Sequence, residues 1–191
     1  MVAETDDLED ESLVIDAPVL RTERLVLRRP ETGDVDALVT LADNRKVAEM
    51  LARMPNPYGE AEATAFIAMA TKSSEAIYVL TTLGERPGVG GALVGCAGLN
   101  MTDRGLELGY WIGEPYWRKG YATEATRAVL DYGFNELGLE EITAVTHPDN
   151  AASQHVLTKC GLKRDGTLNY NGGGEIPFFR LPRSDYEKLL T

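Results

Sequence analysis

A basic turn that contains glycine, WRKGYAT at residues 117–123, is the part of the sequence best suited to bind an anion. Arg118 and Lys119 come directly before Gly120, and a helix is predicted to begin in the following TEATRAVL. The first N–H groups of a helix have no acceptor inside the helix, and the helix dipole is positive at that end. Glycine can take a positive φ and lets a phosphate approach the backbone closely. The turn is therefore predicted to bind a phosphate group, and an ordinary strand-to-helix turn with solvated basic side chains is the alternative.

The turn matches neither of two common nucleotide-binding motifs. It lacks the GK[ST] ending of the P-loop and the three glycines of GxGxxG. No Ser, Thr or Asp follows at the spacing that would hold a metal ion beside the phosphates. A nucleoside-triphosphate-binding domain is therefore disfavoured.

The chain is acidic, since its 191 residues carry a formal net charge of -11. The segment ETDDLEDE at 4–11 has six acids and no base, so residues 1–18 are predicted to form a solvated, disordered tail. The remainder has no basic stripe, which argues against a nucleic-acid partner. A cationic substrate would suit its electrostatic field.

Composition also predicts the compartment. No window approaches the roughly 18 apolar residues that span a bilayer, so no membrane partner is expected. The N-terminus has acids where a signal peptide would carry Lys or Arg, which predicts a cytoplasmic protein. Cys96 and Cys160 lie among small apolar residues and are interpreted as buried free thiols. No spacing of His and Cys suggests a metal site.

Hydrophobic periodicity places strands and helices around the turn in one domain. Seven segments are predicted strands: 24–30, 76–82, 92–99, 106–112, 141–146, 161–167 and 176–181. Helices are predicted over 31–43 with Thr32 or Asp34 as cap, 60–71, 123–137, 150–160 and 184–190. The glycine-containing stretches 83–91 and 169–175 are predicted turns. This order predicts an α+β (mixed α/β) fold, with a mixed sheet, helices on both faces, and one right-handed parallel strand–helix–strand crossover.

From Leu20 to about Leu181 the chain resembles the GNAT superfamily of acyl-CoA-dependent N-acetyltransferases. Three blocks carry the resemblance in the family's order: LRTERLVLRRP, LELGYWIGEPYWRKGYATEA and NAASQHVLTKCGL. They are most similar to the RimJ/RimL-like group of ribosomal-protein N-terminal acetyltransferases. The resemblance implies a single GNAT-like domain over 19–191. Its sheet would be mostly antiparallel, with six to seven strands, splayed between the strand at 106–112 and the strand at 141–146.

The resemblance also implies acetyl-CoA as cosubstrate and no metal. Family members have Q/R-x-x-G-x-G/A at the turn, and here Gly120 and Ala122 take the small positions while Trp117 takes the Q/R position. The backbone N–H groups of six residues would hold the coenzyme A pyrophosphate: Arg118, Lys119, Gly120, Tyr121, Ala122 and Thr123. Ile112 would pair its backbone with the pantetheine arm in the splay, and Asn150 would hydrogen-bond further along that arm.

Transfer to an amine needs a base for the ammonium proton and a proton for the leaving thiolate. Glu107, the only acid in the strand at 106–112, is the predicted base or amine-orienting group, and a solvated strand glutamate is the alternative. Ser153 of the N-x-x-S block is the predicted proton donor. With Asn150 as N-cap, it also fits plain helix-start chemistry. Leu157 stands where many GNAT enzymes have a tyrosine as the acid.

The predicted reaction is direct attack of a primary amine on acetyl-CoA in a ternary complex. The acceptor is a small amine or a protein N-terminus, and the sequence does not decide between them. His147 is interpreted as an incidental loop residue near the acceptor, and Tyr110 and Trp111 are predicted to pack on opposite faces of the sheet. A non-catalytic acyl-CoA-binding sensor is the alternative, because Leu157 replaces the tyrosine and the tail is strongly acidic. A homodimer is left open.

Overall fold

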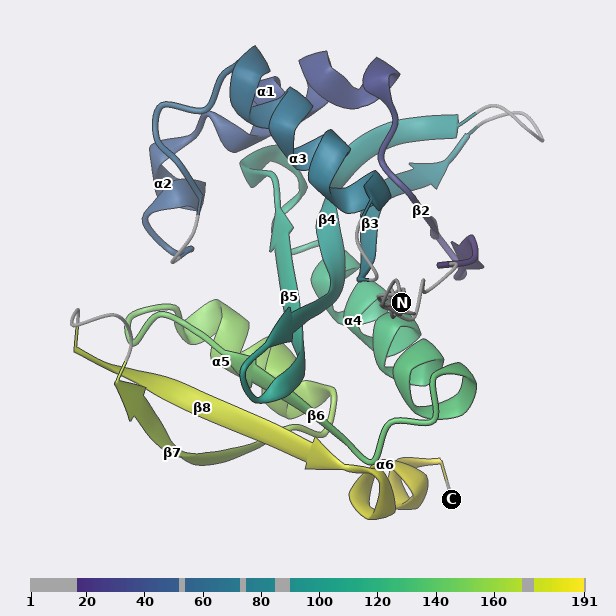
Figure 1. Cartoon of the computed structure of the whole chain (residues 1–191), viewed down its shortest axis with the longest axis vertical. Coiled ribbons are helices and arrows are strands. Elements are labelled where there is room, and N and C mark those ends of the chain that lie inside the picture. The colour runs from purple at the N-terminus through teal and green to yellow at the C-terminus, as the bar shows by residue number, and fades with distance from the viewer. Residues whose placement is uncertain (1–16, 52–53, 73–74, 85–89, 170–173, 191) are drawn as a thin grey trace, which may run out of the picture.

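Eight strands form one sheet in the computed structural model, which describes residues 17–51, 54–72, 75–84, 90–169 and 174–190 (Figure 1). The order in the sheet is β1-β2-β3-β4-β5-β6-β8-β7, and every neighbouring pair is antiparallel except β5 with β6. The strands are β1 (Leu20–Arg21), β2 (Leu25–Arg28), β3 (Ala76–Leu83), β4 (Gly90–Thr102), β5 (Gly105–Ile112), β6 (Glu141–Val145), β7 (Lys163–Asn169) and β8 (Glu175–Pro182). The predicted mixed, mostly antiparallel sheet is confirmed. β1 adds an eighth strand to the expected six or seven, because two residues are too few to show a period.

Six α-helices of the described chain cover both faces of the sheet: α1 (Val35–Ala42), α2 (Arg45–Ala48), α3 (Glu60–Lys72), α4 (Tyr121–Asp131), α5 (Ala151–Lys159) and α6 (Arg183–Leu189). Two 3₁₀ turns lie at Thr32–Asp34 and Glu114–Tyr116, and α4 runs on into a π-helical turn at Tyr132–Glu136. Helix α2 was not expected, because its four residues are too few to show helical periodicity.

The sheet separates two hydrophobic clusters. Helices α1 and α3 pack on one face, where the buried residues include Leu38, Ile67 and Val79. Helices α4 and α5 pack on the other face, where they include Leu99, Val129 and Leu157. Strand β5 contributes to both clusters, with Trp111 against the first and Leu108 in the second. Successive residues of β5 therefore point to opposite faces.

Strands β5 and β6 part after a short contact, which opens the sheet. Their parallel register holds a single pair, Glu107 with Thr143, although β5 continues to Ile112. Figure 1 shows β5 running away from β6, while β6 stays beside β8. The predicted parallel crossover and the predicted splay are both confirmed.

Three predicted features lie wholly or partly outside the described residues: the tail at 1–18, the turn at 83–91 and the turn at 169–175. Ala17, near the end of the predicted tail, is buried in the same cluster as α4 and α5. Among the helices described, none has the length and apolar character that crossing a bilayer requires.

A part-buried ion pair joins β2 to the start of α1. The guanidinium of Arg28 donates to both carboxylate oxygens of Asp34, at 2.8 and 2.7 Å, and the Glu31 N–H donates to the same carboxylate at 2.8 Å. Burial alone would raise the pKa of Asp34, but these hydrogen bonds outweigh it and the pKa lies below its ordinary value. Asp34, one of the two predicted caps, thus bonds back toward Glu31 and β2 rather than into α1.

We expect Asp34→Ala to lower the free energy of unfolding at neutral pH by about 2–3 kcal/mol. This lies below the range for a fully buried pair, because the Arg28 side chain is 26% exposed. A lowered folded-state pKa stabilises the fold above the unfolded pKa of Asp, near 3.9. The difference from wild type should therefore shrink as pH falls through and below that value. Urea unfolding at several pH values measures it. The exposed Asp36→Ala should change the free energy by about 0.5 kcal/mol or less, and an equal loss in both variants would contradict the role of the pair.

Candidate active site

The turn at residues 117–123 has the backbone shape of an anion-binding site. Arg118 and Gly120 both adopt left-handed angles, with φ of 61° and 82°, and Gly120 is the N-cap of α4. Within the described chain, no backbone hydrogen bond uses the N–H groups from Arg118 to Thr123. Free N–H donors at the positive end of a helix dipole bind phosphate groups. The turn therefore offers the donors that the predicted phosphate site requires.

Residues between β1 and β2 hold this turn in place through a network of hydrogen bonds. Glu124 accepts hydrogen bonds from Thr22 Oγ1 at 2.6 Å, from the Arg24 N–H at 2.8 Å and from Arg24 Nε at 2.7 Å. Arg24 Nη1 donates to the Lys119 carbonyl at 2.8 Å, and the guanidinium lies 5.0 Å from the centre of the Tyr121 ring. Burial would raise the pKa of Glu124, but the hydrogen bonds from Thr22 and Arg24 lower it below its ordinary value. The bonds behind the turn leave its N–H groups free.

A cavity of about 1470 Å³ extends from the turn, past the end of β5, to α2 and α3. Eight of the ten predicted site residues line it: Ile112, Arg118, Gly120, Tyr121, Ala122, Thr123, Asn150 and Ser153. Glu107 and Lys119 are not among the lining residues, and Lys119 Nζ instead lies 5.3 Å from the centre of the Tyr116 ring. Ligand pockets are usually about 300–1,000 Å³. The cavity therefore has room for two ligands.

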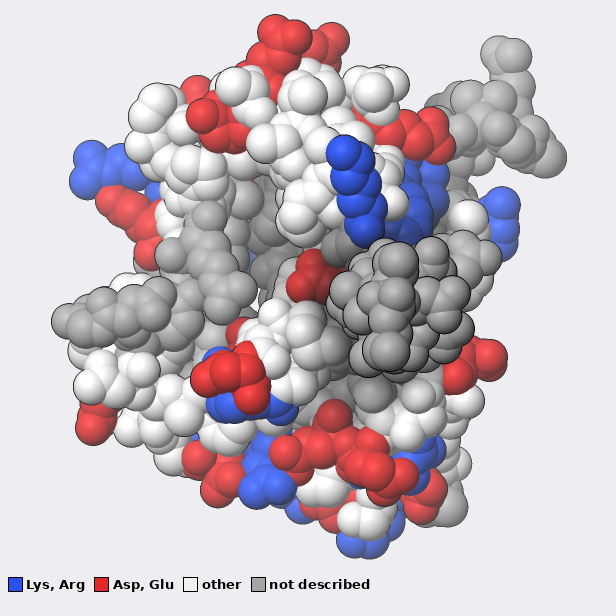
Figure 2. Space-filling view, in the orientation of Figure 1, with Lys and Arg blue, Asp and Glu red and all other residues white. Residues whose placement is uncertain are grey.

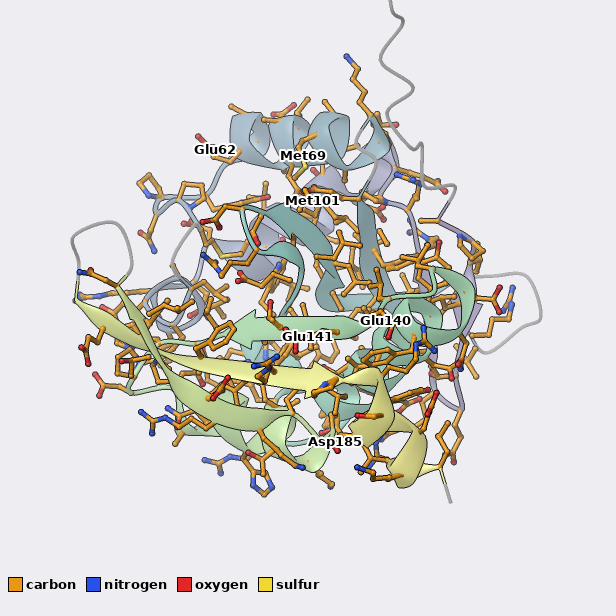
Figure 3. The ribbon with its side chains drawn as sticks, turned by 60° about the horizontal axis from the view of Figure 1, so that its bottom comes forward. Glu62, Met69, Met101, Glu140, Glu141 and Asp185 are labelled. Atoms are coloured by element: carbon orange, nitrogen blue, oxygen red, sulfur yellow. The ribbon has the colours of Figure 1, made fainter. Side chains whose placement is uncertain are left out.

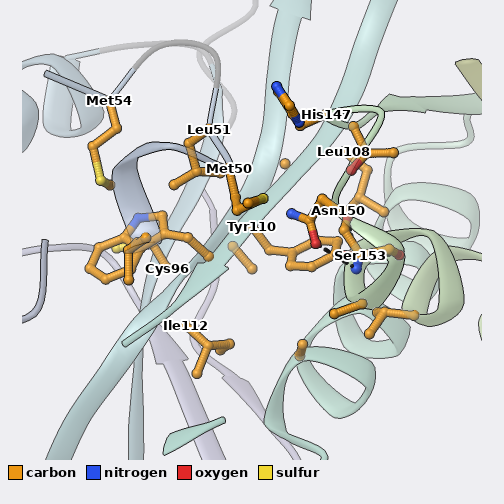
Figure 4. Close-up of a pocket in the computed structure, with 18 of the residues that line it drawn as sticks. Met50, Leu51, Met54, Cys96, Leu108, Tyr110, Ile112, His147, Asn150 and Ser153 are labelled. Atoms are coloured by element: carbon orange, nitrogen blue, oxygen red, sulfur yellow. Dashed lines mark hydrogen bonds between the residues drawn. The ribbon is translucent and has the colours of Figure 1, made fainter. Parts of the chain in front are cut away.

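The cavity has two walls of different character (Figure 4). Asn150 and Ser153 lie on one side, Leu51 and Met54 lie on the other, and Met50 lies between them in this view. Figure 2 shows acidic side chains over α3 and, mixed with Lys and Arg, over β8 and α6, where ion pairs such as Lys163–Asp185 and Arg180–Glu141 form. The formal net charge of -11, rather than one acidic patch, favours the approach of a cation.

The Trp117 indole connects the end of β5 to the turn at residues 117–123. The Gly113 N–H donates to the Val94 carbonyl at 2.9 Å. Because only alternate residues of an antiparallel strand bond the same neighbour, the N–H and C=O of Ile112 point away from β4 and into the splay. Trp117 Nε1 donates to the Ile112 carbonyl at 2.6 Å. This bond leaves the Ile112 N–H directed into the splay. The departure from the family's Q/R position therefore has a structural role in this chain.

Ser153 is held by groups from two elements. Its N–H donates to Asn150 Oδ1 at 3.0 Å, so Asn150 is the N-cap of α5 as well as a cavity residue. The Tyr110 hydroxyl lies 2.9 Å from Ser153 Oγ and donates to the Ser153 carbonyl at 3.1 Å. Burial raises the pKa of Tyr110 well above its ordinary value, so its hydroxyl stays protonated at neutral pH. The pair places two hydroxyl groups at the cavity wall.

Glu107 lies beside the cavity rather than on its wall. Its position in β5 puts it on the face of Trp111, opposite to that of Tyr110, and confirms that Tyr110 and Trp111 face opposite sides. The carboxylate is nearly buried, with 10% of the side chain exposed, and Oε2 accepts a hydrogen bond from Arg104 Nη2 at 3.1 Å. Its partner across the sheet, Asn100, does line the cavity. Glu107 is thus a partly shielded acid and not the solvated strand glutamate of the alternative.

His147 and Leu157 also lie at the cavity. His147 lines the cavity, and its Nδ1 accepts a hydrogen bond from the Asp149 N–H at 3.2 Å. Leu157 is buried and also lines the cavity, one turn along α5 from Ser153. Leu157 carries no hydroxyl group that could act as the acid, but the Tyr110 hydroxyl, from β5, lies within hydrogen-bond distance of Ser153 Oγ. Among the described residues, no three His, Cys, Asp or Glu side chains gather where they could hold a metal ion.

Comparison with known proteins gives one family. The family described as "Acetyltransferase (GNAT) domain" matches residues 24–163. The uncharacterized N-acetyltransferase YoaA of Bacillus subtilis is 33% identical over 158 residues, which cover 79% of this chain and 86% of the relative.

Solved structures agree on the fold. An acetyltransferase (GNAT family) from Bacillus anthracis has a TM-score of 0.76 at 24% identity, covering 87% of this chain and 99% of that one. A spermidine N-acetyltransferase from Vibrio cholerae, in complex with CoA and spermine, has a TM-score of 0.69 at 23% identity, covering 87% and 99%.

The anion site can be tested at its glycine. We expect Gly120→Asp to abolish binding of coenzyme A, because the added carboxylate repels the pyrophosphate and the positive φ strains any side chain. Isothermal titration with coenzyme A measures the affinity. Gly138→Asp is the matched control, since Gly138 also has a positive φ, of 68°, and an added Cβ there meets nothing within 4 Å. Equal affinity in the two variants would rule the turn out as the binding site.

Proposed function

The chain belongs to the GNAT acetyltransferase family and is an acetyltransferase, and on that premise we propose that it moves acetyl from acetyl-CoA to a primary amine by direct attack in a ternary complex. The observation that carries this proposal is the single cavity that joins the free N–H groups of the turn to the open end of β5. A ternary complex needs both ligands in one continuous space, and the volume of about 1470 Å³ allows that.

The cavity residues fit acetyl-CoA, which supplies an activated acetyl thioester when bound. The N–H groups from Arg118 to Thr123 would hold the pyrophosphate, with the Arg118 charge beside them. Lys119 would contribute its backbone N–H and its charge rather than a side-chain contact. Asn150 uses its side-chain oxygen as a cap, so its amide nitrogen stays available to the pantetheine arm.

Three groups would act on the reacting atoms. The Ile112 N–H faces the splay and would polarise the thioester carbonyl. The Ser153 hydroxyl would donate a proton toward the leaving sulfur, and the Tyr110 hydroxyl would orient it. Glu107 would take the amine proton through a water molecule, since Oε2 is held by Arg104 and no described residue bonds Oε1. An ammonium acceptor loses two protons on becoming an amide: one balances the proton that the leaving thiolate gains, and the other passes through Glu107 and water to the solvent.

The finer assignments belong to the same proposal. The blocks at 20–30, 106–125 and 150–162 support membership in the RimJ/RimL-like group, with a transferase domain over 19–191 and an acidic tail over 1–18. The acceptor is then a protein N-terminus or a small amine, and the structural neighbour that holds spermine supports the second. Two buried free cysteines, Cys96 and Cys160, fit a reducing cytoplasm. Nucleic acid, membrane and metal play no part in the proposal, and a homodimer stays open.

The non-catalytic sensor remains the second candidate function because of Leu157. A sensor would bind acetyl-CoA tightly and release no thiol with any amine. The Tyr110–Ser153 pair weakens this alternative, because it supplies hydroxyl groups where Leu157 has none.

The role of Glu107 can be tested by removing its charge. Glu107→Gln should lower kcat for amine transfer by about 100-fold, as expected for loss of a general base, while acetyl-CoA affinity stays near that of the wild type. Asp103→Asn is the control, because Asp103 pairs with the same Arg104 but is 80% exposed at the side chain. Initial rates of thiol release give kcat and KM. A wild-type rate in Glu107→Gln would exclude Glu107 as the base.

The hydrogen-bonded pair of Tyr110 and Ser153 predicts that the losses of kcat from removing the two hydroxyl groups are not independent. Ser153→Ala should lower kcat by about 100-fold and Tyr110→Phe by about tenfold, the effect of one lost hydrogen bond. If Tyr110 acts only through Ser153, the double variant should be no slower than Ser153→Ala. Tyr78→Phe is the control, since Tyr78 is buried and its hydroxyl has no partner in the described chain. If the fold-reductions in kcat of the two single variants multiply in the double variant, Tyr110 acts independently of Ser153.

A further inference from the structure

The part of the cavity beyond the tip of β5 has an apolar wall, formed by Met50, Leu51, Met54, Phe66, Met69 and Trp111. These side chains come from the segment after α2, from α3 and from β5. In Figure 4, Leu51 and Met54 lie across the cavity from Asn150 and Ser153, and Met50 lies between the two groups in this view. Because the turn and α5 line the coenzyme side, the apolar wall is where an acceptor would lie.

The carboxylates beside the apolar wall already have partners. Glu62 Oε2 accepts a hydrogen bond from the Gly59 N–H at 2.9 Å, and Glu75 Oε1 accepts one from the Met101 N–H at 2.7 Å. Glu49 forms an ion pair with Arg45. A polyamine carries several ammonium groups and needs a carboxylate for each when it leaves water. Each of these carboxylates already uses an oxygen within the fold, and Asp149, the other acid of the described chain that lines the cavity, is 84% exposed at its side chain, so a polyamine would find few carboxylates free to pair with it on leaving water.

Half of the apolar wall is methionine. Met50, Met54 and Met69 have unbranched side chains with polarizable sulfur, which adapt to ligands of different shape. Phe66 and Trp111 add flat aromatic surface. The apolar wall therefore suits a variety of large apolar groups rather than one rigid shape.

We propose that the acceptor is a primary amine borne next to a large apolar group, such as a peptide whose first residue is methionine, leucine or phenylalanine, or an arylalkylamine. This inference rests on the proposed transferase function. The apolar wall binds the side chain of the acceptor, and the amine then points toward the splay and Ser153. Polyamines and peptides that begin with a small polar residue lack the group that the apolar wall would bury.

Four acceptors test the substrate class with the full-length chain: 2-phenylethylamine, spermidine, and two tripeptide amides that differ only in a first methionine or serine. We expect kcat/KM for 2-phenylethylamine and the methionine peptide to exceed that for spermidine and the serine peptide by about tenfold or more, the effect of burying one large apolar side chain. Comparison of 2-phenylethylamine with the methionine peptide tells a small amine from a peptide N-terminus. Equal or better turnover of spermidine or the serine peptide would overturn the proposal.

A charged substitution in the apolar wall gives the matched test. Met50→Glu should reduce the preference for 2-phenylethylamine over spermidine by about tenfold or more. Met101→Glu is the control, because Met101 is exposed and does not line the cavity. Met101 follows the cavity residue Asn100 in β4, so the control lies near the cavity without lining it, and Figure 3 labels Met101 together with Met69, a methionine of the apolar wall on α3. An unchanged preference in Met50→Glu would count against the proposal.

Binding separates failure of this inference from failure of the proposed function. Calorimetry measures the affinity of each amine for the complex of the chain with coenzyme A, which needs no turnover. If no amine releases thiol, the transferase proposal fails, and the order of affinities still decides the class. Tighter binding of the apolar amines supports the inference, and equal or tighter binding of spermidine overturns it.

Discussion

The parting of β5 from β6 is the constraint on which the rest of the site depends. Strands that separate leave backbone N–H and C=O groups without partners, and each such group costs on the order of 1–3 kcal/mol when it is buried. The chain satisfies part of this need itself, because the Trp117 indole bonds the Ile112 carbonyl. The remaining groups face a cavity, where an amide-containing arm such as pantetheine can bond them. The opening in the sheet is thus both a structural weakness and the proposed binding site.

The turn before α4 also has backbone N–H groups without partners in the described chain, and side chains from elsewhere in the chain hold it in shape. An anion site needs N–H groups that stay free in the folded protein, yet a free loop would lose entropy when a ligand orders it. Here Thr22, Arg24 and Glu124 hold the turn through the Lys119 carbonyl and through side chains, and none of these bonds uses the N–H groups of the turn. The site is therefore ordered before the ligand arrives, with the Arg24 guanidinium, itself paired with Glu124, beside it.

The sequence predicted most of the fold, because its longer elements have clear periodicity. Strands β3 to β6 and helices α3 to α5 were all expected, whereas β1 and α2 were missed because they have two and four residues. The anion turn was predictable because its donors are neighbours in the chain. The pair of Tyr110 with Ser153 was not, since it depends on how α5 packs on β5. Strand alternation placed Glu107 opposite Tyr110, but only the fold shows which face borders the cavity.

The bond from Arg24 to Glu124 joins residues a hundred positions apart. A fragment that contained the turn and α4 alone would lack this bond, so the anion-binding shape belongs to the whole folded chain and not to a local segment. A ligand that binds only the folded state stabilises it by mass action, by about 2.7 kcal/mol at a concentration one hundred times its Kd. The coenzyme would then be more than a reactant, because its cellular supply would lower the small fraction of the chain that is unfolded at any moment.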